Sequence, residues 1–154
     1  MEIWPSVFEN IWLADDDQDD QLVFENALKE IAPSLLLEKF NNCEQLLLAL
    51  ETRKPDLLFL DINMPGLNGK ECLKIIKENP SIKKLPVIVH SGSDYKVDIL
   101  TSYRYGATLY IIKPKSYREI VKTLEALLVL DWNNPEAITY NQYQNNLFVP
   151  FRAL

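Results

Sequence analysis

Short apolar runs alternate along the chain with longer segments in which apolar residues recur every three or four positions. The short runs have the length and composition of β-strands. Three of them are almost wholly apolar, as central parallel strands buried on both faces usually are. The five predicted strands cover residues 10–14, 35–40, 57–60, 87–90 and 109–112.

The longer segments have the spacing of amphipathic helices. Phe24, Ala27, Leu28 and Ile31 share one face of a predicted helix, which Pro33 ends. Apolar spacing and capping residues predict four more helices. These lie at 43–51 after the cap Asn42, from Gly69 through Ile76, at 94–105 before Gly106, and around Ile120, Leu124 and Leu127.

Five rounds of strand and helix predict an α/β domain with a doubly wound, parallel five-stranded sheet flanked by helices. Crossovers between parallel strands are right-handed. In such sheets, ligands bind beyond the carboxyl ends of the strands, where the strand order reverses. The residues that follow the strands are therefore the candidates for chemistry.

Polar residues follow four of the five predicted strands. The first strand runs into "DDDQDD" at 15–20, the third into Asp61, the fourth into Ser91, and the fifth into Lys113 and Pro114. We expect all four groups to meet at one edge of the sheet. Asp61 is notable because a carboxylate directly after an apolar run is costly to bury unless its charge is used.

Three carboxylates, those of Asp15, Asp16 and Asp61, are expected at this edge. Carboxylates that share a site repel one another, and a divalent cation relieves that repulsion. All the expected ligands are hard oxygen atoms, which favours Mg²⁺ over zinc. The sequence therefore predicts a magnesium site.

Composition narrows the class of protein. The chain has 154 residues, 47% hydrophobic and 25% charged, which indicates a single globular domain. Its net charge of −6 argues against nucleic acid as a partner. No segment has the length of a membrane span and the start does not resemble a signal peptide, so we expect a cytoplasmic protein without a membrane partner. Cys43 and Cys72 lie in unrelated segments and are expected to be reduced, packed thiols.

Four motifs, each at a strand end, together resemble the receiver domain of the response-regulator family. They are the acid pair Asp15–Asp16, "LDINMPGLNG" at 60–69, "HSG" at 90–92 and "YIIKP" at 110–114. The resemblance extends from residue 10 to residue 130. It implies a flavodoxin-like sheet of order 2-1-3-4-5 and a role in two-component signalling.

The resemblance implies a role for each strand-end acid. Asp61 would be the phosphoacceptor, taking a phosphoryl group from a sensor histidine kinase or a histidine phosphotransfer protein. Asp16 and Asp61 would ligate Mg²⁺ together with the backbone carbonyl of Asn63, and Asp15 would act through a bound water. Such a domain signals and is not an enzyme, apart from self-phosphorylation with small donors and slow self-dephosphorylation.

The same resemblance assigns the remaining site residues. Lys113 would contact the phosphoryl oxygens and Ser91 would donate a hydrogen bond to one of them. Ser91 and Tyr110 would form the switch that responds to phosphorylation. The family has a cis bond between the residues at Lys113 and Pro114. It usually has an apolar or aromatic residue where this chain has Lys115, and this departure changes the surface beside the fifth strand that many members use for partner contact.

Other readings compete with these roles. We expect the start of the first helix to carry the solvated side chains of Asp17, Asp19 and Asp20, because acidic residues are favourable near a helix N-terminus. His90 is one residue from Ser91 and should point to the other face, where it would be structural. Asp15 and Asp17 also form the D-x-D of haloacid-dehalogenase phosphatases, although the cap insertion is absent. The third alternative is a degenerate receiver that serves only as a docking module.

Residues 131–154 follow the predicted receiver domain, residues 1–130, and are too few for a separate output domain. We therefore expect a single-domain response regulator that signals through contacts with another protein, whose identity the sequence does not give. The apolar side chains of 131–154 suggest packing on the domain or on a second copy. We expect a homodimer that uses the surface of 94–105 and 109–112 together with this extension.

Overall fold

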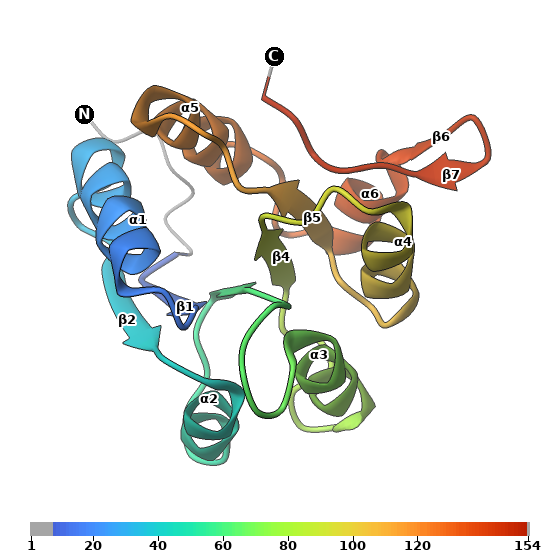
Figure 1. The fold of residues 1–154 in the computed structure, drawn as a ribbon, viewed down its shortest axis with the longest axis horizontal. Helices are drawn as coiled ribbons and strands as arrows, with labels where there is room; N and C mark the ends of the chain where they lie inside the picture. The colour runs from blue at the N-terminus through green and yellow to red at the C-terminus, as the bar shows by residue number, and fades with distance from the viewer. Residues whose placement is uncertain (1–7, 154) are drawn as a thin grey trace.

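Five parallel strands form the central sheet in the order β2-β1-β3-β4-β5, as predicted (Figure 1). The protein is described by a computed structural model that covers residues 8–153. The strand bounds agree with the apolar runs to within one residue. The strands are β1 Asn10–Ala14, β2 Leu36–Phe40, β3 Leu57–Leu60, β4 Val87–Ser91 and β5 Leu109–Ile112.

Helices cover both faces of the sheet. Helices α1 and α5 pack together on one face, whereas α2, α3 and α4 lie on the other (Figure 1). Their bounds are α1 Gln18–Ile31, α2 Cys43–Leu50, α3 Gly69–Glu78, α4 Lys96–Arg104 and α5 Tyr117–Leu128. Within residues 8–153, none of the helices combines the length and the apolar character needed to cross a membrane.

Alternate residues of each strand supply the two halves of the core. In β1, Ile11 and Leu13 face α1 and α5, whereas Trp12 and Ala14 face α2 and α3. All four residues of β3 are fully buried, which explains its continuous apolar sequence. The core therefore holds the strands rigidly up to the edge where the polar residues begin.

The helices begin at the capping residues that their sequences indicate. The side chain of Asn42 accepts a hydrogen bond from the Gln45 N–H at the start of α2, as predicted. Ser116 caps α5 in the same way by accepting from the Glu119 N–H. After α4, Gly106 adopts a positive φ of 103° and leads the chain into β5.

Cys43 and Cys72 form a disulfide between α2 and α3, so the prediction of two reduced thiols was wrong. Both residues are fully buried on the same face of the sheet, and their Cα atoms are 6.1 Å apart. The two cysteines are 29 positions apart in the sequence, so no local pattern reveals this proximity. Only the packing of α2 beside α3 brings the two sulfur atoms together.

The C-terminal extension folds onto its own domain. It contains a short helix, α6 Pro135–Tyr140, and a hairpin of β6 Tyr143–Gln144 and β7 Leu147–Phe148. Asn145 and Asn146 form the hairpin turn with positive φ values of 50° and 66°, a conformation that asparagine tolerates well. Trp132 and Ile138 are buried in the core on the α1 and α5 side.

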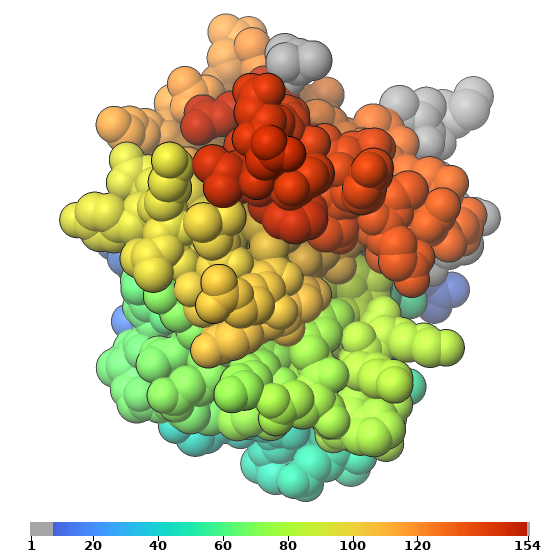
Figure 2. Space-filling view, turned by 90° about the vertical axis from the view of Figure 1, so that its right-hand side faces the viewer, coloured from blue at the N-terminus to red at the C-terminus, as the bar shows by residue number. Residues whose placement is uncertain are grey.

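The end of the extension then runs beside β5. The Phe151 N–H donates to the Tyr110 carbonyl over 2.8 Å. The Tyr103 hydroxyl accepts from the Tyr110 N–H and donates to the Val149 carbonyl. The extension, red in Figure 2, therefore lies across the molecule close to α4 and β5. Of the two expected positions, packing on its own domain is the one found.

Candidate functional site

The carboxyl ends of four strands bring the predicted site residues together. Asp15 directly follows β1, Asp61 follows β3, Ser91 is the last residue of β4, and Lys113 follows β5. Hydrogen bonds between strands continue to this edge, since the Asp61 N–H donates to the Ala14 carbonyl and the Lys113 N–H to the Ser91 carbonyl. The sheet therefore fixes the backbone at each strand end.

The carboxylates of Asp15, Asp16 and Asp61 form a cluster in which one oxygen of each lies within 4.8 Å of the others. Asp15 and Asp61 are buried and Asp16 is exposed, so the cluster opens to solvent on one side. Burial raises the pKa of Asp15 to about 6, although hydrogen bonds from the Asp17 N–H and from Lys113 oppose the shift. The chemistry of these donors suits a hard divalent cation.

Lys113 contacts three carboxylates at once. Its Nζ lies 2.9 Å from Asp15, 2.8 Å from Asp20 and 3.1 Å from Asp61. Burial alone would lower the pKa of Lys113, but the hydrogen bonds to Asp20 and Asp15 and the charges of Asp61 and Asp15 outweigh it, so the pKa is raised. The amine is therefore fully charged at neutral pH.

The contact between Asp20 and Lys113 corrects the prediction that Asp20 only solvates a helix start. Asp17 does serve the helix, because its side chain caps α1 by accepting from the N–H groups of Asp19 and Asp20. Asp19 is exposed. The position of Asp20 in the sequence is compatible with this contact, because the first turn of the helix that follows β1 lies next to the carboxyl ends of the strands.

The loop after β3 holds Asp61 in place. The Asp61 carboxylate accepts a hydrogen bond from the Asn63 N–H over 2.9 Å. Gly69, the first residue of α3, packs so closely on the strand end that an added Cβ would overlap the carbonyl oxygen of Asp61 and the Cα of Ile62. Only glycine allows this approach. The second glycine of "LDINMPGLNG" thus positions α3 against the candidate acceptor.

Ser91 and Tyr110, the predicted switch pair, both connect to the turn after β4. The fully buried Ser91 hydroxyl accepts hydrogen bonds from the Asn63 side-chain amide over 3.2 Å and from the Ser93 N–H over 3.1 Å. The Tyr110 hydroxyl donates to the Ser93 carbonyl over 2.8 Å. Tyr110 is itself fully buried, so its ring points inward.

The peptide bond between Lys113 and Pro114 is trans, in contrast to the cis bond that the resemblance implied. The lysine nevertheless reaches Asp61. The long, flexible side chain thus brings its amine to the site from a trans backbone.

His90 lies on the opposite face of β4 from Ser91, as expected, and packs against aromatic rings. The centroid of its ring is 5.8 Å from that of Phe24 and 6.3 Å from that of Phe59. Burial, assisted by the charge of Lys113, lowers the pKa of His90 to about 3. The imidazole is therefore neutral, and its Nδ1 has no hydrogen-bond partner among residues 8–153.

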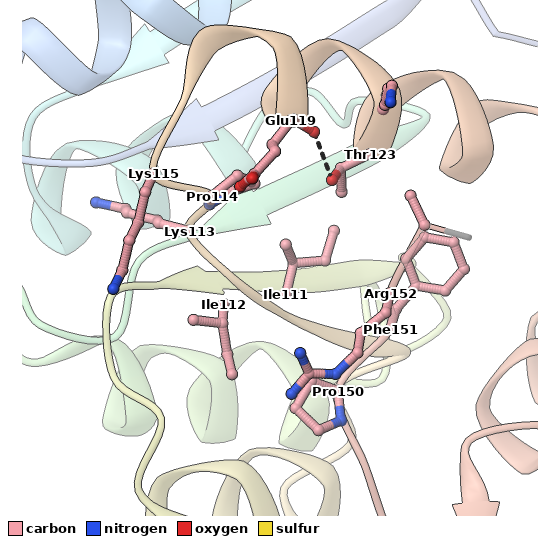
Figure 3. Close-up of a pocket in the computed structure, with 12 residues that line it drawn as sticks. Ile111, Ile112, Lys113, Pro114, Lys115, Glu119, Thr123, Pro150, Phe151 and Arg152 are labelled. Atoms are coloured by element: carbon pink, nitrogen blue, oxygen red, sulfur yellow. Dashed lines mark hydrogen bonds between the residues drawn. The ribbon is translucent and has the colours of Figure 1, made fainter.

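A groove of about 500 Å³ lies beside the site, between β5, the start of α5 and the end of the extension (Figure 3). Lys113 and Pro114 line one side, and Phe151 and Arg152 of the extension line another. The carboxylate cluster does not line this groove. The extension therefore shapes the surface next to the site without covering the acids.

The sequence model of the response regulator receiver domain matches residues 11–125, and the chain belongs to this family. Members are signalling modules of two-component systems. A curated relative, the DNA-binding transcriptional regulator NtrC of Salmonella typhimurium, is 37% identical over 118 residues. That match covers 75% of this chain and 24% of NtrC, so the chain spans about a quarter of the length of this relative.

Solved structures share the fold. The phosphorylated cyanobacterial phytochrome response regulator RcpA superposes with a TM-score of 0.73 at 26% identity, over 79% of this chain and 91% of RcpA. The Mn²⁺-bound form of response regulator Rcp1 gives a TM-score of 0.73 at 24% identity, over 80% of this chain and 96% of Rcp1. Both likenesses agree with the doubly wound sheet described above.

Proposed function

We propose that this protein is a response regulator whose receiver domain accepts a phosphoryl group on Asp61. The observation that carries the proposal is the contact of the Lys113 amine with the Asp61 carboxylate, 3.1 Å apart, beside two further acids. Transfer of a phosphoryl group depends mainly on positioning and on stabilisation of negative charge. An attacking oxygen and a fixed cation next to it meet both needs.

A divalent cation, Mg²⁺ by the choice of ligands, completes the proposed site. Asp16 and Asp61 would hold it with the carbonyl of Asn63, and Asp15 would act through a water molecule. When bound, the ion neutralises charge on the carboxylates and on phosphoryl oxygens. The clustered oxygens of the three acids support this assignment. Rcp1, a structural neighbour, is known in a Mn²⁺-bound form.

The chain's own residues have separate tasks in this proposal. Asp61 supplies the attacking carboxylate oxygen, and Lys113 binds a phosphoryl oxygen with its amine. The Ser91 hydroxyl, which now accepts from Asn63 and Ser93, would donate its proton to a second phosphoryl oxygen. Tyr110, hydrogen-bonded to the same turn, would report that change to the surface beside β5.

The phosphodonor is a separate protein, a sensor histidine kinase or a histidine phosphotransfer protein. The single histidine of the chain, His90, is buried against Phe24 and Phe59 on the far side of β4. That imidazole cannot reach Asp61 as a donor. We therefore propose that the phosphohistidine belongs to a partner protein.

The proposed output is a change in protein contacts, including formation of a homodimer. Three apolar side chains of the folded extension stay exposed: Tyr140 at 72%, Tyr143 at 44% and Leu147 at 40%. We propose that a second copy covers these side chains together with the adjoining surface of α4, which contacts β7. An unidentified downstream protein is the other partner of this surface.

The phosphatase alternative is disfavoured by the position of Asp17. A haloacid-dehalogenase enzyme needs the second acid of its D-x-D in the site. Here that carboxylate is engaged as the cap of α1. Docking without phosphorylation is disfavoured because Asp61, Lys113 and Ser91 are all present and adjacent.

Intact-mass measurement after incubation with acetyl phosphate and Mg²⁺ tests the proposal. Wild-type protein should gain one acid-labile phosphoryl group, and chelation of the metal should prevent the gain. Asp61→Asn should gain none, whereas Asp19→Asn, an exposed change in the first turn of α1, should be labelled normally. Equal labelling of the Asp61→Asn variant would rule out Asp61 as the acceptor.

A further inference from the structure

Among residues 8–153, three carboxylates contact Lys113, and that of Asp20 has no task in the proposed acceptor and metal site. Its carboxylate lies 2.8 Å from the Lys113 Nζ, closer than the carboxylate of Asp61 at 3.1 Å. An ammonium group has three N–H donors. In this structure Asp20 and Asp61 accept hydrogen bonds from the amine, and Asp15 forms an ion pair with it at 2.9 Å. A phosphoryl group would therefore have to compete with these carboxylates for the amine.

Helix α1 fixes Asp20 in this position. The Asp17 cap binds the Asp20 N–H over 3.1 Å, and the side chain then extends from the first turn towards the end of β5. Asp19 has the same charge and the same cap, but among residues 8–153 it has no contact with Lys113. The two neighbours therefore form a matched pair.

The three carboxylates differ in how easily they can release the lysine. The side chain of Asp15 is 1% exposed, whereas that of Asp20 is 43% exposed. A buried carboxylate that loses its partner is left unsatisfied, which is costly, but water can solvate an exposed one. Asp20 is therefore the partner that gives up Lys113 most readily.

We propose that Asp20 is a positioning residue that competes with the phosphoryl group for Lys113. This inference rests on the proposed function of Asp61. Before phosphorylation, Asp20 holds the amine at the side of the site that faces α1. On phosphorylation, one N–H of Lys113 moves from Asp20 to a phosphoryl oxygen. Asp20 thereby opposes the phosphorylated state and sets how strongly the site binds the incoming group.

The test is the affinity for beryllium fluoride, a phosphoryl mimic, measured by calorimetry in Mg²⁺. Asp20→Asn should bind beryllium fluoride about three- to ten-fold more tightly than wild type. This factor is the usual contribution of one hydrogen bond, here the bond of Lys113 to the competing carboxylate. Asp20→Glu, which keeps the charge, should return the affinity towards the wild-type value.

Asp19→Asn is the control, because it removes the same charge from the same helix end. Its affinity should stay within about two-fold of wild type, since exposed charges without a contact are screened. A purely structural role of these acids in α1 would weaken binding in both variants and would not tighten it in either. Thermal unfolding of each variant measures that role directly.

The outcomes separate the two proposals. If wild type binds beryllium fluoride and Asp20→Asn binds no more tightly, the competition for Lys113 is refuted and the proposed function stands. Equal tightening in Asp19→Asn would also refute it, since the effect would then be one of general charge. If wild type binds no beryllium fluoride, the acceptor site itself is wrong and both proposals fail.

Discussion

Lys113 carries the only positive charge found within contact distance of the acidic cluster among residues 8–153. Lys113→Ala should still bind Mg²⁺, because the carboxylates remain. Its labelling by acetyl phosphate should slow by about 100-fold, the usual cost of removing one charge-stabilising donor. Calorimetry measures the metal affinity and intact mass the labelling rate. Loss of Mg²⁺ binding in this variant would show that our division of roles is wrong.

His90 makes the stability of the protein depend on pH. Its pKa is about 3 in the folded protein because the ring is buried, whereas a histidine in the unfolded chain has a pKa of about 6.5. Below that value only the unfolded state gains the proton, so the free energy of unfolding falls as the pH decreases towards 3. By pH 5 this contribution amounts to about 2 kcal/mol.

Chemical denaturation of wild type and His90→Leu at pH 7 and pH 5 measures this effect. Wild type should lose about 2 kcal/mol more than the variant between the two pH values. The comparison removes the contributions of other titrating groups that the two proteins share. Parallel losses would mean that His90 titrates in the folded protein as it does in water.

Individual site residues differed in how well the sequence predicted them. Asp61, Ser91 and Lys113 were predicted because each comes at the end of an apolar run, and parallel strands bring such residues to one edge. Asp20 was missed because its contact depends on the rotation of α1 and on a side-chain conformation. The disulfide was missed because no local pattern connects Cys43 with Cys72.

At the scale of the element, the position of α3 depends on Gly69. Gly69→Ala should destabilise the protein by about 2–3 kcal/mol, because the new Cβ would push α3 away from the end of β3. Gly92→Ala is the control, since no atom lies within 4 Å of the position of its Cβ. Urea denaturation measures both. Equal stability of the two variants would contradict the close approach of α3 to Asp61.

Helices and strands in which apolar residues recur at regular spacing could be predicted from the sequence, and those without such spacing could not. The apolar runs of the sheet and the stripes of α1 and α5 follow directly from spacing. Strands β6 and β7 have two residues each, too few for any period. The Asn145–Asn146 pair does indicate the turn between them, because asparagine suits the positive φ of a tight hairpin turn. The sequence therefore predicts that the extension packs on the domain or on a second copy, but it does not predict the hairpin.

At the scale of the whole molecule, the extension is expected to contribute to a homodimer. Replacing the exposed Tyr143 and Leu147 by serine (Tyr143→Ser with Leu147→Ser) removes apolar surface but keeps the buried Trp132 and Ile138 and the hydrogen bond between Phe151 and Tyr110. The doubly substituted protein should be a monomer in light scattering, with or without beryllium fluoride, and should still be labelled on Asp61. A full-length protein that stays monomeric in both conditions would contradict the homodimer.

The strand β5 forms one border of the sheet, and its four residues are all apolar. An uncovered border of this kind offers free N–H and C=O groups to strands of other molecules, which leads to aggregation. Here both backbone groups of Tyr110 are already engaged within the chain, by the Tyr103 hydroxyl and by the Phe151 N–H. Tyr103 and Phe151 therefore leave less of this border free for strand pairing, and we expect these contacts to reduce aggregation at high protein concentration.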